Sequence, residues 1–290
     1  MADTKQFQRR TERRRGVLAR VLTTALLLAA IGLLISSASC SGAGRAASAP
    51  VGSVERCSGS RIQTVAPGAN AAIEVALDGS VSTRSSSLRR QYVEVAQATV
   101  EQAVTQHAAL RIVVFGSSGV GARVVFSASF APVSTVMAFN LAAANRLRCL
   151  ADAAIADAFR ASPPKIGSDV AGATAAAVGW VRAVVKSGGM GAVTVATDGC
   201  QSPAKAGPNA RLTDLCGVIR HGVGLPQILE KHAKEFSLGD ARGIRLQMVG
   251  LGVGRDAADA STSRAQEVVA FWQLVCARAH AASCLIGSTL

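Results

Sequence analysis

Two short segments of the chain carry oxygen-bearing side chains at a spacing that suits a metal ion. The first is Asp78-Gly79-Ser80-Val81-Ser82, in which one carboxylate and two hydroxyls occupy alternate positions. The second is Thr197-Asp198-Gly199, which adds another carboxylate. Carboxylate and hydroxyl oxygens are hard ligands, and they suit an octahedral Mg²⁺ or Mn²⁺ that keeps some of its water. The residue types therefore predict a divalent metal site that includes Asp78, Ser80, Ser82 and Asp198.

Each of these segments directly follows an apolar stretch that predicts a strand. Residues 71–77 precede the first segment and residues 191–196 precede the second. In open α/β sheets, ligands bind beyond the carboxyl ends of the parallel strands. A carboxylate at the end of a buried strand, such as Asp78, also needs a polar or charged partner. We therefore expect both segments to lie at the same edge of one sheet.

The rest of the chain alternates between strand and helix patterns. Further strands are expected at residues 110–115, 123–126 and 244–251, and helices at residues 85–108, 135–160, 170–186, 225–236 and 261–282. Residues 116–121 should join two neighbouring strands as a hairpin-like connection. This alternation predicts an α/β fold with a doubly wound, mainly parallel sheet and helices on both faces. No sixth strand can be recognised after residue 251, because the remainder has a helical pattern.

The ordered motifs resemble those of the von Willebrand factor A-type (vWA) domain with its metal-ion-dependent adhesion site. That family has a D-x-S-x-S motif after the first strand, a Thr in a later loop and an Asp in T-D-G after the fourth strand. The resemblance covers roughly residues 70–283 and implies a Rossmann-like vWA fold. It implies Thr174, in Gly172-Ala173-Thr174, as a further metal ligand. It also implies that bound Mg²⁺ or Mn²⁺ takes an acidic side chain of a protein partner, without catalysis.

Simpler interpretations of the same residues remain open. Ser80 and Ser82 could cap a helix that begins near Ser85, and Asp198-Gly199 could be only a turn. The fold could also act as a metal-free structural scaffold of the cell envelope. A metal-assisted hydrolase ranks third, because the sequence offers no general base beside the ligands themselves.

Two enzyme classes lack their expected motifs. The Gly-rich stretch 116–121 resembles the start of a phosphate-binding loop, but Ala122 and Arg123 follow where Lys and Ser or Thr are required. The sequence also contains no G-x-S-x-G nucleophile motif, and its four histidines are isolated from one another. We therefore expect a binding protein and not an enzyme.

The N-terminus has the pattern of an export signal. Basic residues crowd positions 1–20, an apolar stretch runs over residues 21–35, and small residues lead to Cys40. The position of Cys40 resembles that of the lipidated cysteine in bacterial lipoproteins, and an uncleaved membrane helix is the alternative. Residues 1–40 are thus a predicted signal or anchor, and the Gly-, Ala- and Ser-rich residues 41–56 a flexible tether. Residues 57–290 are expected to form one vWA-like domain, exported and attached to the outer face of the cell membrane.

The cysteines support export. The chain has seven, and setting Cys40 aside for lipid leaves an even number, as a disulfide framework requires. Six cysteines allow many pairings. Closeness in sequence favours Cys200–Cys216 and Cys276–Cys284, which leaves Cys57–Cys149.

The chain is strongly basic, with 31 Lys and Arg against 18 Asp and Glu and a net charge of +13. The basic residues beyond the N-terminal segment are scattered, with neither a basic helix nor interleaved aromatic residues. This distribution argues against nucleic-acid binding. It is instead consistent with a surface that attracts an acidic protein partner.

Overall fold

A computed structural model describes residue 57 and residues 62–83, 85–117, 122–160, 167–202, 212–252 and 262–287. The predicted signal, anchor and tether, residues 1–56, lie outside the described residues. The assignments of these segments therefore stay predictions.

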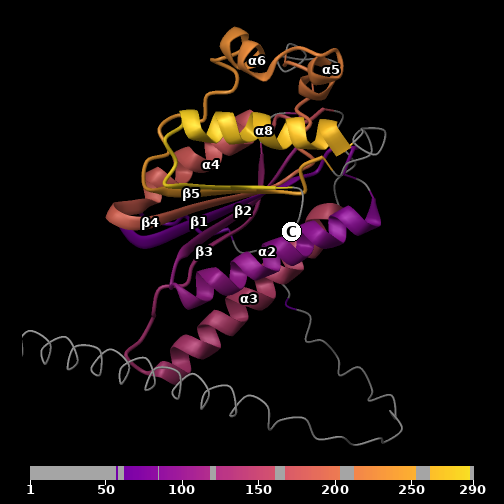
Figure 1. The fold of residues 1–290 in the computed structure, drawn as a ribbon. Coiled ribbons are helices and arrows are strands. Elements are labelled where there is room, and N and C mark those ends of the chain that lie inside the picture. The colour runs from indigo at the N-terminus through magenta and orange to yellow at the C-terminus, as the bar shows by residue number, and fades with distance from the viewer. Residues whose placement is uncertain are drawn as a thin grey trace, which may run out of the picture. The chain divides into compact units, whose positions relative to one another are not determined.

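The described residues form a six-stranded sheet in the order β3-β2-β1-β4-β5-β6 (Figure 1). The strands are β1 (Ala69–Asp78), β2 (Ala109–Phe115), β3 (Arg123–Ser129), β4 (Val185–Ala196), β5 (Ile244–Val249) and β6 (Ser283–Ile286). All neighbouring strands are parallel except β3, which runs antiparallel to β2 as the hairpin-like pattern predicted. This is the strand order of a doubly wound sheet. The predicted α/β fold class is confirmed, and the mixed sheet is consistent with a vWA-like fold.

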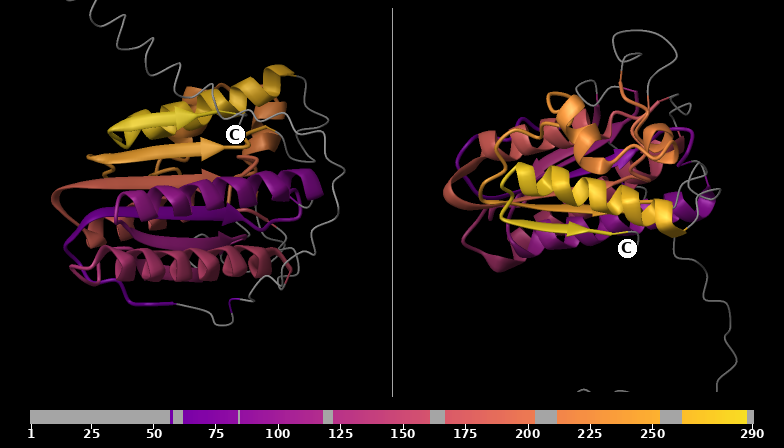
Figure 2. Two further views of the ribbon diagram at one scale, coloured as in Figure 1. Left: turned by 90° about the horizontal axis from the view of Figure 1, so that it is seen from below. Right: turned by 45° about the horizontal axis from the view of Figure 1, so that its top comes forward.

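Helices bury both faces of the sheet. On one face lie α2 (Ser86–Thr105) and α3 (Met137–Arg160), which run side by side in Figure 2. The other face is covered by α4 (Val170–Val184), α5 (Leu215–Arg220), α6 (Leu225–Lys231) and α8 (Thr262–Arg278). Successive residues of β1 alternate between the two cores: Ile73 and Val75 pack under α2 and α3, and Ala72 and Ala76 face the α4 side.

Strand register brings the carboxyl ends of β1, β4 and β5 to one level. Leu77 of β1 pairs with Ala196 of β4, and Ala196 in turn pairs with Val249 of β5. The residues that follow these strands therefore meet at one edge of the sheet, which we call the site rim. It includes Asp78, Thr197 and Gly250.

Three local expectations need correction. A sixth strand does exist: β6 is four residues long, too short for a pattern, and it adds in parallel to β5. The helix expected over residues 170–186 ends at Val184, and β4 already begins at Val185.

The third correction concerns the helix expected over residues 225–236, which ends at Lys231. The segment after it is held by tertiary hydrogen bonds. Glu235 Oε1 accepts from Gln201 Nε2 at 2.5 Å and from Thr213 N at 2.7 Å, and His232 Nδ1 lies 2.8 Å from Thr213 Oγ1. These bonds fix the chain in turns and take the place of a continued helix. The short helix α5 was not expected either.

Three disulfides link the cysteines as closeness in sequence favoured: Cys57–Cys149, Cys200–Cys216 and Cys276–Cys284. Such bonds are typical of oxidising, extracytoplasmic compartments. Within the described ranges, no helix is both long and apolar enough to cross a bilayer.

A buried ion pair joins two central strands. Glu74 of β1 lies beside Arg111 of β2, and Arg111 Nη2 is 2.6 Å from Glu74 Oε2. The Arg111 guanidinium also lies 4.7 Å from the centre of the Trp180 ring on α4. Burial raises the pKa of Glu74 to about 7, because the loss of hydration outweighs the charge and hydrogen bond of Arg111.

This pKa predicts a pH-dependent contribution to stability. Because folding raises the pKa of Glu74, its contribution is fully present below the ordinary value of 4.5 and is lost as pH rises through about 7. Glu74→Gln cannot ionise, so the wild type should lose stability relative to this variant between about pH 5 and about pH 8. Denaturant unfolding of both proteins at the two pH values measures the change. A difference that stays constant with pH would contradict the prediction.

Candidate metal site

The segment after β1 folds back on itself around the Asp78 carboxylate. Asp78 is fully buried, and its Oδ1 accepts a hydrogen bond from Ser80 N at 2.9 Å. The Thr83 hydroxyl donates to the carbonyl oxygens of Asp78 and Ser80, both at 2.9 Å. Ser80 Oγ and Ser82 Oγ lie 3.0 Å apart. The structure thus brings Asp78, Ser80 and Ser82 together at the site rim.

Neither serine caps the following helix. Helix α2 begins at Ser86, and the Oγ of Ser85 accepts the hydrogen bond from Leu88 N at 3.2 Å. The helix-capping interpretation of Ser80 and Ser82 is therefore wrong. Their hydroxyls belong to the rim.

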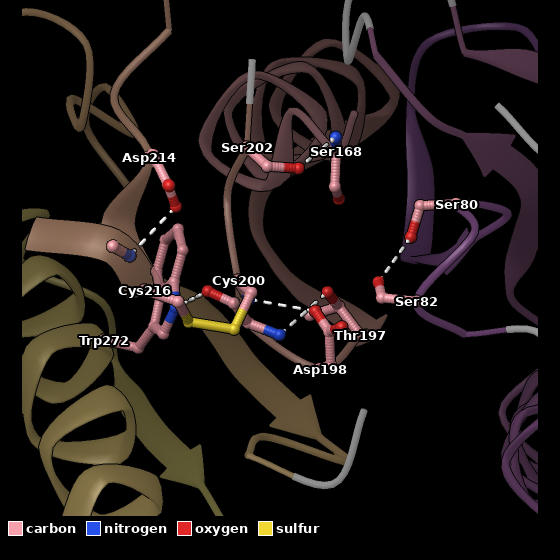
Figure 3. The surroundings of a disulfide bond; sticks show 12 residues. Ser80, Ser82, Ser168, Thr197, Asp198, Cys200, Ser202, Asp214, Cys216 and Trp272 are labelled. Carbon is pink, nitrogen blue, oxygen red and sulfur yellow. Dashed lines mark hydrogen bonds between the residues drawn. A yellow bond between two sulfur atoms is a disulfide. The ribbon is translucent and has the colours of Figure 1, made fainter. Parts of the chain in front are cut away.

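The segment after β4 meets the first one through a hydrogen bond. Thr197 Oγ1 donates to Asp78 Oδ2 at 2.8 Å. Asp198 is fully buried, and its Oδ1 accepts from Cys200 N at 2.9 Å, the bond of a local turn. Figure 3 shows Thr197 and Asp198 facing the region that Ser80 and Ser82 approach from β1. Asp198-Gly199 thus do form a turn, and the hydrogen bond of that turn involves Asp198 Oδ1.

Gly199 is fixed by packing. Its φ is +78°, and an added Cβ would lie 2.6 Å from Leu251 Cδ2 and 2.9 Å from Val268 Cγ1. Trp272 Nε1 donates to the Gly199 carbonyl at 3.0 Å. The next residue, Cys200, is tied to α5 by its disulfide with Cys216 (Figure 3). The β4 end is therefore held from several sides.

The structure places Thr174 inside α4, one turn beyond the first residue of the helix. Its hydroxyl donates to Val170 O at 2.7 Å inside α4, the usual back-bond of a helical threonine. Ser168, just before α4, donates instead to Asp78 Oδ2 at 2.9 Å. Sequence reasoning missed Ser168, because a single serine after a Pro-rich stretch carries no signal of its own. The antiparallel bridge between Ser168 and Ser202 positions it (Figure 3).

The hydrogen-bond donors to the buried Asp78 carboxylate are all neutral groups. Burial raises its pKa, while hydrogen bonds from the Ser80 amide and from the Ser80, Thr197 and Ser168 hydroxyls lower it. Amide and hydroxyl dipoles compensate a buried charge only in part. A cation at the rim would complete the compensation and favour the ionised form.

The only tyrosine of the chain reaches the same rim. Tyr92 of α2 is fully buried, and its hydroxyl has no hydrogen-bond partner in the described part of the protein. Burial raises its pKa well above the ordinary value, and the carboxylates of Asp78 and Asp198 raise it further. A Cβ on Gly250 would lie 3.1 Å from Tyr92 Cε1 and 3.2 Å from Thr197 O, so the ring lies beside the ends of β4 and β5. A buried hydroxyl without a partner costs about 1–3 kcal/mol and indicates a polar group absent from the protein itself.

The donor set fits a hard divalent cation. It comprises two buried carboxylates, from Asp78 and Asp198, with the hydroxyls of Ser80, Ser82 and Ser168 beside them. No group of three or more His, Cys, Asp or Glu side chains that could hold a metal ion occurs among the described residues. Any cation here would thus depend on hydroxyls as well as carboxylates.

Neither a family model nor a curated protein matches the sequence. Among solved structures, the chain is similar to the conserved hypothetical protein BatB from Bacteroides thetaiotaomicron, with 14% identity, a TM-score of 0.33, and coverage of 76% of this chain and 91% of that one. It is also similar to the pilus adhesin SpaC from Lactobacillus rhamnosus GG in its open conformation, with 13% identity, a TM-score of 0.35, and coverage of 75% and 27%. A third match is proximal thread matrix protein 1 from the mussel byssus, with 11% identity, a TM-score of 0.32, and coverage of 75% and 49%. Matches this remote carry no argument about function.

The packing of Gly199 makes a testable prediction. Gly239 also has a positive φ, +71°, but an added Cβ there meets nothing within 4 Å. Replacing Gly239 with alanine should therefore lower the free energy of unfolding by about 1–2 kcal/mol from backbone strain alone. At Gly199 the overpacking should add about 1–3 kcal/mol. Denaturant unfolding of Gly199→Ala and Gly239→Ala measures both losses, and equal losses would show that Gly199 is needed for its φ alone.

Proposed function

We propose that this protein is an extracytoplasmic vWA-like binding module. In this proposal a divalent cation, Mg²⁺ or Mn²⁺, is held at the site rim by Asp78, Ser80, Ser82, Ser168 and Asp198. The observation that carries it is the meeting of two segments with buried carboxylates at one rim, joined by the Thr197–Asp78 hydrogen bond. Such a cation would supply an open coordination position for a carboxylate oxygen of an acidic protein partner.

The chain's own residues prepare the rim for this task. Ser168 and Thr197 both donate to Asp78 Oδ2, and the Ser80 amide donates to Oδ1, so the carboxylate is oriented before anything binds. Preorganised ligands lower the ordering cost of binding. The net positive charge of the chain would assist the approach of an acidic partner.

The proposal includes export and attachment. Residues 1–40 would direct export and anchor the chain at the outer face of the cell membrane, through lipid on Cys40 or through an uncleaved helix. Residues 41–56 would form the tether. The three disulfides support the extracytoplasmic compartment.

Metal binding predicts stabilisation that depends on Asp78. A ligand that binds only the folded state raises the free energy of unfolding by about 2.7 kcal/mol when its free concentration is 100 times its dissociation constant. The full chain in detergent solution should therefore unfold at higher temperature in Mg²⁺ or Mn²⁺ than in EDTA. The gain should vanish in Asp78→Asn, shrink in Ser168→Ala and persist in Thr174→Ala.

Tyr92 supplies a direct probe of the same event. A ¹³Cζ-tyrosine label gives one resonance, because the chain has a single tyrosine. Mn²⁺ at the rim should broaden this resonance in the wild type and in the control Asp240→Asn, but not in Asp78→Asn. The Asp240 carboxylate pairs with Arg182 and Arg242 before β5 begins, at the end of the sheet opposite the site rim. No thermal shift and no broadening in the wild type would contradict metal binding and favour the metal-free scaffold.

Recognition of acidic side chains is tested separately. Poly-glutamate is the probe, and its binding to the full chain should be stronger in Mg²⁺ than in EDTA. Because the protein is basic, binding in EDTA measures simple charge attraction. The metal-dependent increment should be absent in Asp78→Asn. A wild type that gains stability from Mg²⁺ but shows no increment would have a structural metal and no adhesion site.

A further inference from the structure

The sheet edge opposite the site rim exposes an unusual apolar segment. Five large apolar side chains are between 49% and 76% exposed there: Val133, Val136, Met137, Phe139 and Leu141. They belong to the β3–α3 connection and the first residues of α3. Residues 129–145 contain no charged side chain at all. Soluble monomeric proteins rarely expose contiguous apolar surface on this scale without a binding partner.

A cavity of about 350 Å³ opens beneath this segment. Its lining is mostly apolar and comes from the end of α2, the end of β3 and the start of α3, including Val104, Phe130, Met137, Leu141 and Leu147. The segment is thus backed by further apolar surface into which hydrocarbon could pack.

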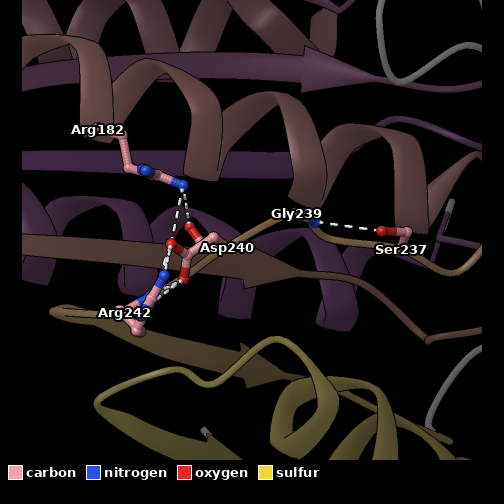
Figure 4. Close-up of polar contacts among 5 residues, drawn as sticks. All are labelled: Arg182, Ser237, Gly239, Asp240 and Arg242. Carbon is pink, nitrogen blue, oxygen red and sulfur yellow. Dashed lines mark hydrogen bonds and ion pairs between the residues drawn. The ribbon is translucent and has the colours of Figure 1, made fainter.

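Basic side chains are exposed along the same edge, where β4 and β5 begin and α4 and α8 end. They are Arg182, Lys186, Arg242, Arg245 and Arg278. Asp240, which lies among them, is shared between Arg242 Nη2 at 2.9 Å and Arg182 Nη1 at 3.5 Å (Figure 4). We call residues 133–141 together with these five basic residues the basal rim. It is apolar on its β3 side and cationic on its β5 side.

The disulfide Cys57–Cys149 fixes where the tether leaves the domain. Cys149 follows Met137 by twelve residues on α3, so the exit lies about 18 Å along the helix from the apolar segment. The expected tether, residues 41–56, spans about 22 Å as a flexible coil and at most about 55 Å when extended. A tether of this length would allow the basal rim of an anchored chain to reach the bilayer.

We infer that the basal rim rests on an anionic lipid bilayer, with residues 133–141 inserted at the headgroup boundary and the five basic side chains on lipid phosphates. Apolar side chains beside Lys and Arg are the combination that binds such surfaces. A second copy of the chain would bring like charges together at the β5 side, which disfavours a symmetric pairing. The inference rests on the expected N-terminal anchor and is independent of the metal site. In this orientation the site rim points away from the membrane.

The test uses the full chain reconstituted into vesicles of phosphatidylcholine with brominated acyl chains, with and without phosphatidylglycerol. Phe139→Trp places a reporter in the apolar segment, and Val223→Trp places a matched reporter at an exposed position between α5 and α6. The brominated acyl chains should quench the emission of the tryptophan introduced by Phe139→Trp by roughly half, as expected for a side chain buried about 5–10 Å into the boundary region. Val223→Trp should stay unquenched. Phosphatidylglycerol should increase the quenching, and Lys186→Glu/Arg245→Glu should remove that increase.

Hydrogen exchange of the wild type serves as a second measurement that needs no substitution. Residues 131–142 should exchange more slowly in vesicles than in detergent-free protein released from lipid. Equal quenching of the two reporters, or unchanged exchange, would overturn the inference. So would protection that disappears on dilution of protein in lipid, which indicates contact between copies, or a chain that does not float with the vesicles. None of these outcomes depends on Mg²⁺, so the metal proposal is judged separately.

Discussion

The burial of the Asp78 carboxylate is the constraint on which the site depends. A charge removed from water must be compensated, and here the compensation comes from three separate segments of the chain. Those segments can meet only because β1 and β4 end at the same level, with Leu77 paired to Ala196. The parallel register thus does more than pair the strands of the sheet. It decides which side chains lie next to one another, and it explains why Asp78 contacts residues 90 and 119 positions later in the chain.

Much of this arrangement could be predicted from the sequence. Buried parallel strands give nearly continuous apolar runs, so β1 and β2 were evident, and the polar residues directly after β1 and β4 had to lie at one edge. The disulfides followed from cysteine number and closeness. What escaped prediction depends on tertiary contacts. Ser168 is placed by its bridge to Ser202, and β6 by its neighbour β5 and by the link from Cys276 to Cys284.

Thr174 shows the reverse case, a residue that a motif singled out and that the fold places inside a helix. A family motif suggested that a threonine near the start of the helix would reach the rim. Inside a helix, however, a threonine hydroxyl has a ready acceptor four residues earlier, and Thr174 uses the Val170 carbonyl. Spacing along the chain could not distinguish a residue one turn inside α4 from one just before it. In the structure Ser168, just before α4, is the one that donates a hydrogen bond to Asp78.

The disulfide between Cys57 and Cys149 also has a mechanical consequence. If the chain is anchored at its N-terminus and binds a partner at the site rim, as proposed, it would carry tension, and that tension would enter the folded domain at Cys57. The next described segment lies along the edge of β3, where Gln63 N donates to Ser127 O, and leads directly into β1 at the centre of the sheet. Without the disulfide, a pull would peel this segment away one hydrogen bond at a time. With it, part of the load would pass at Cys149 into α3, whose buried face packs on the sheet.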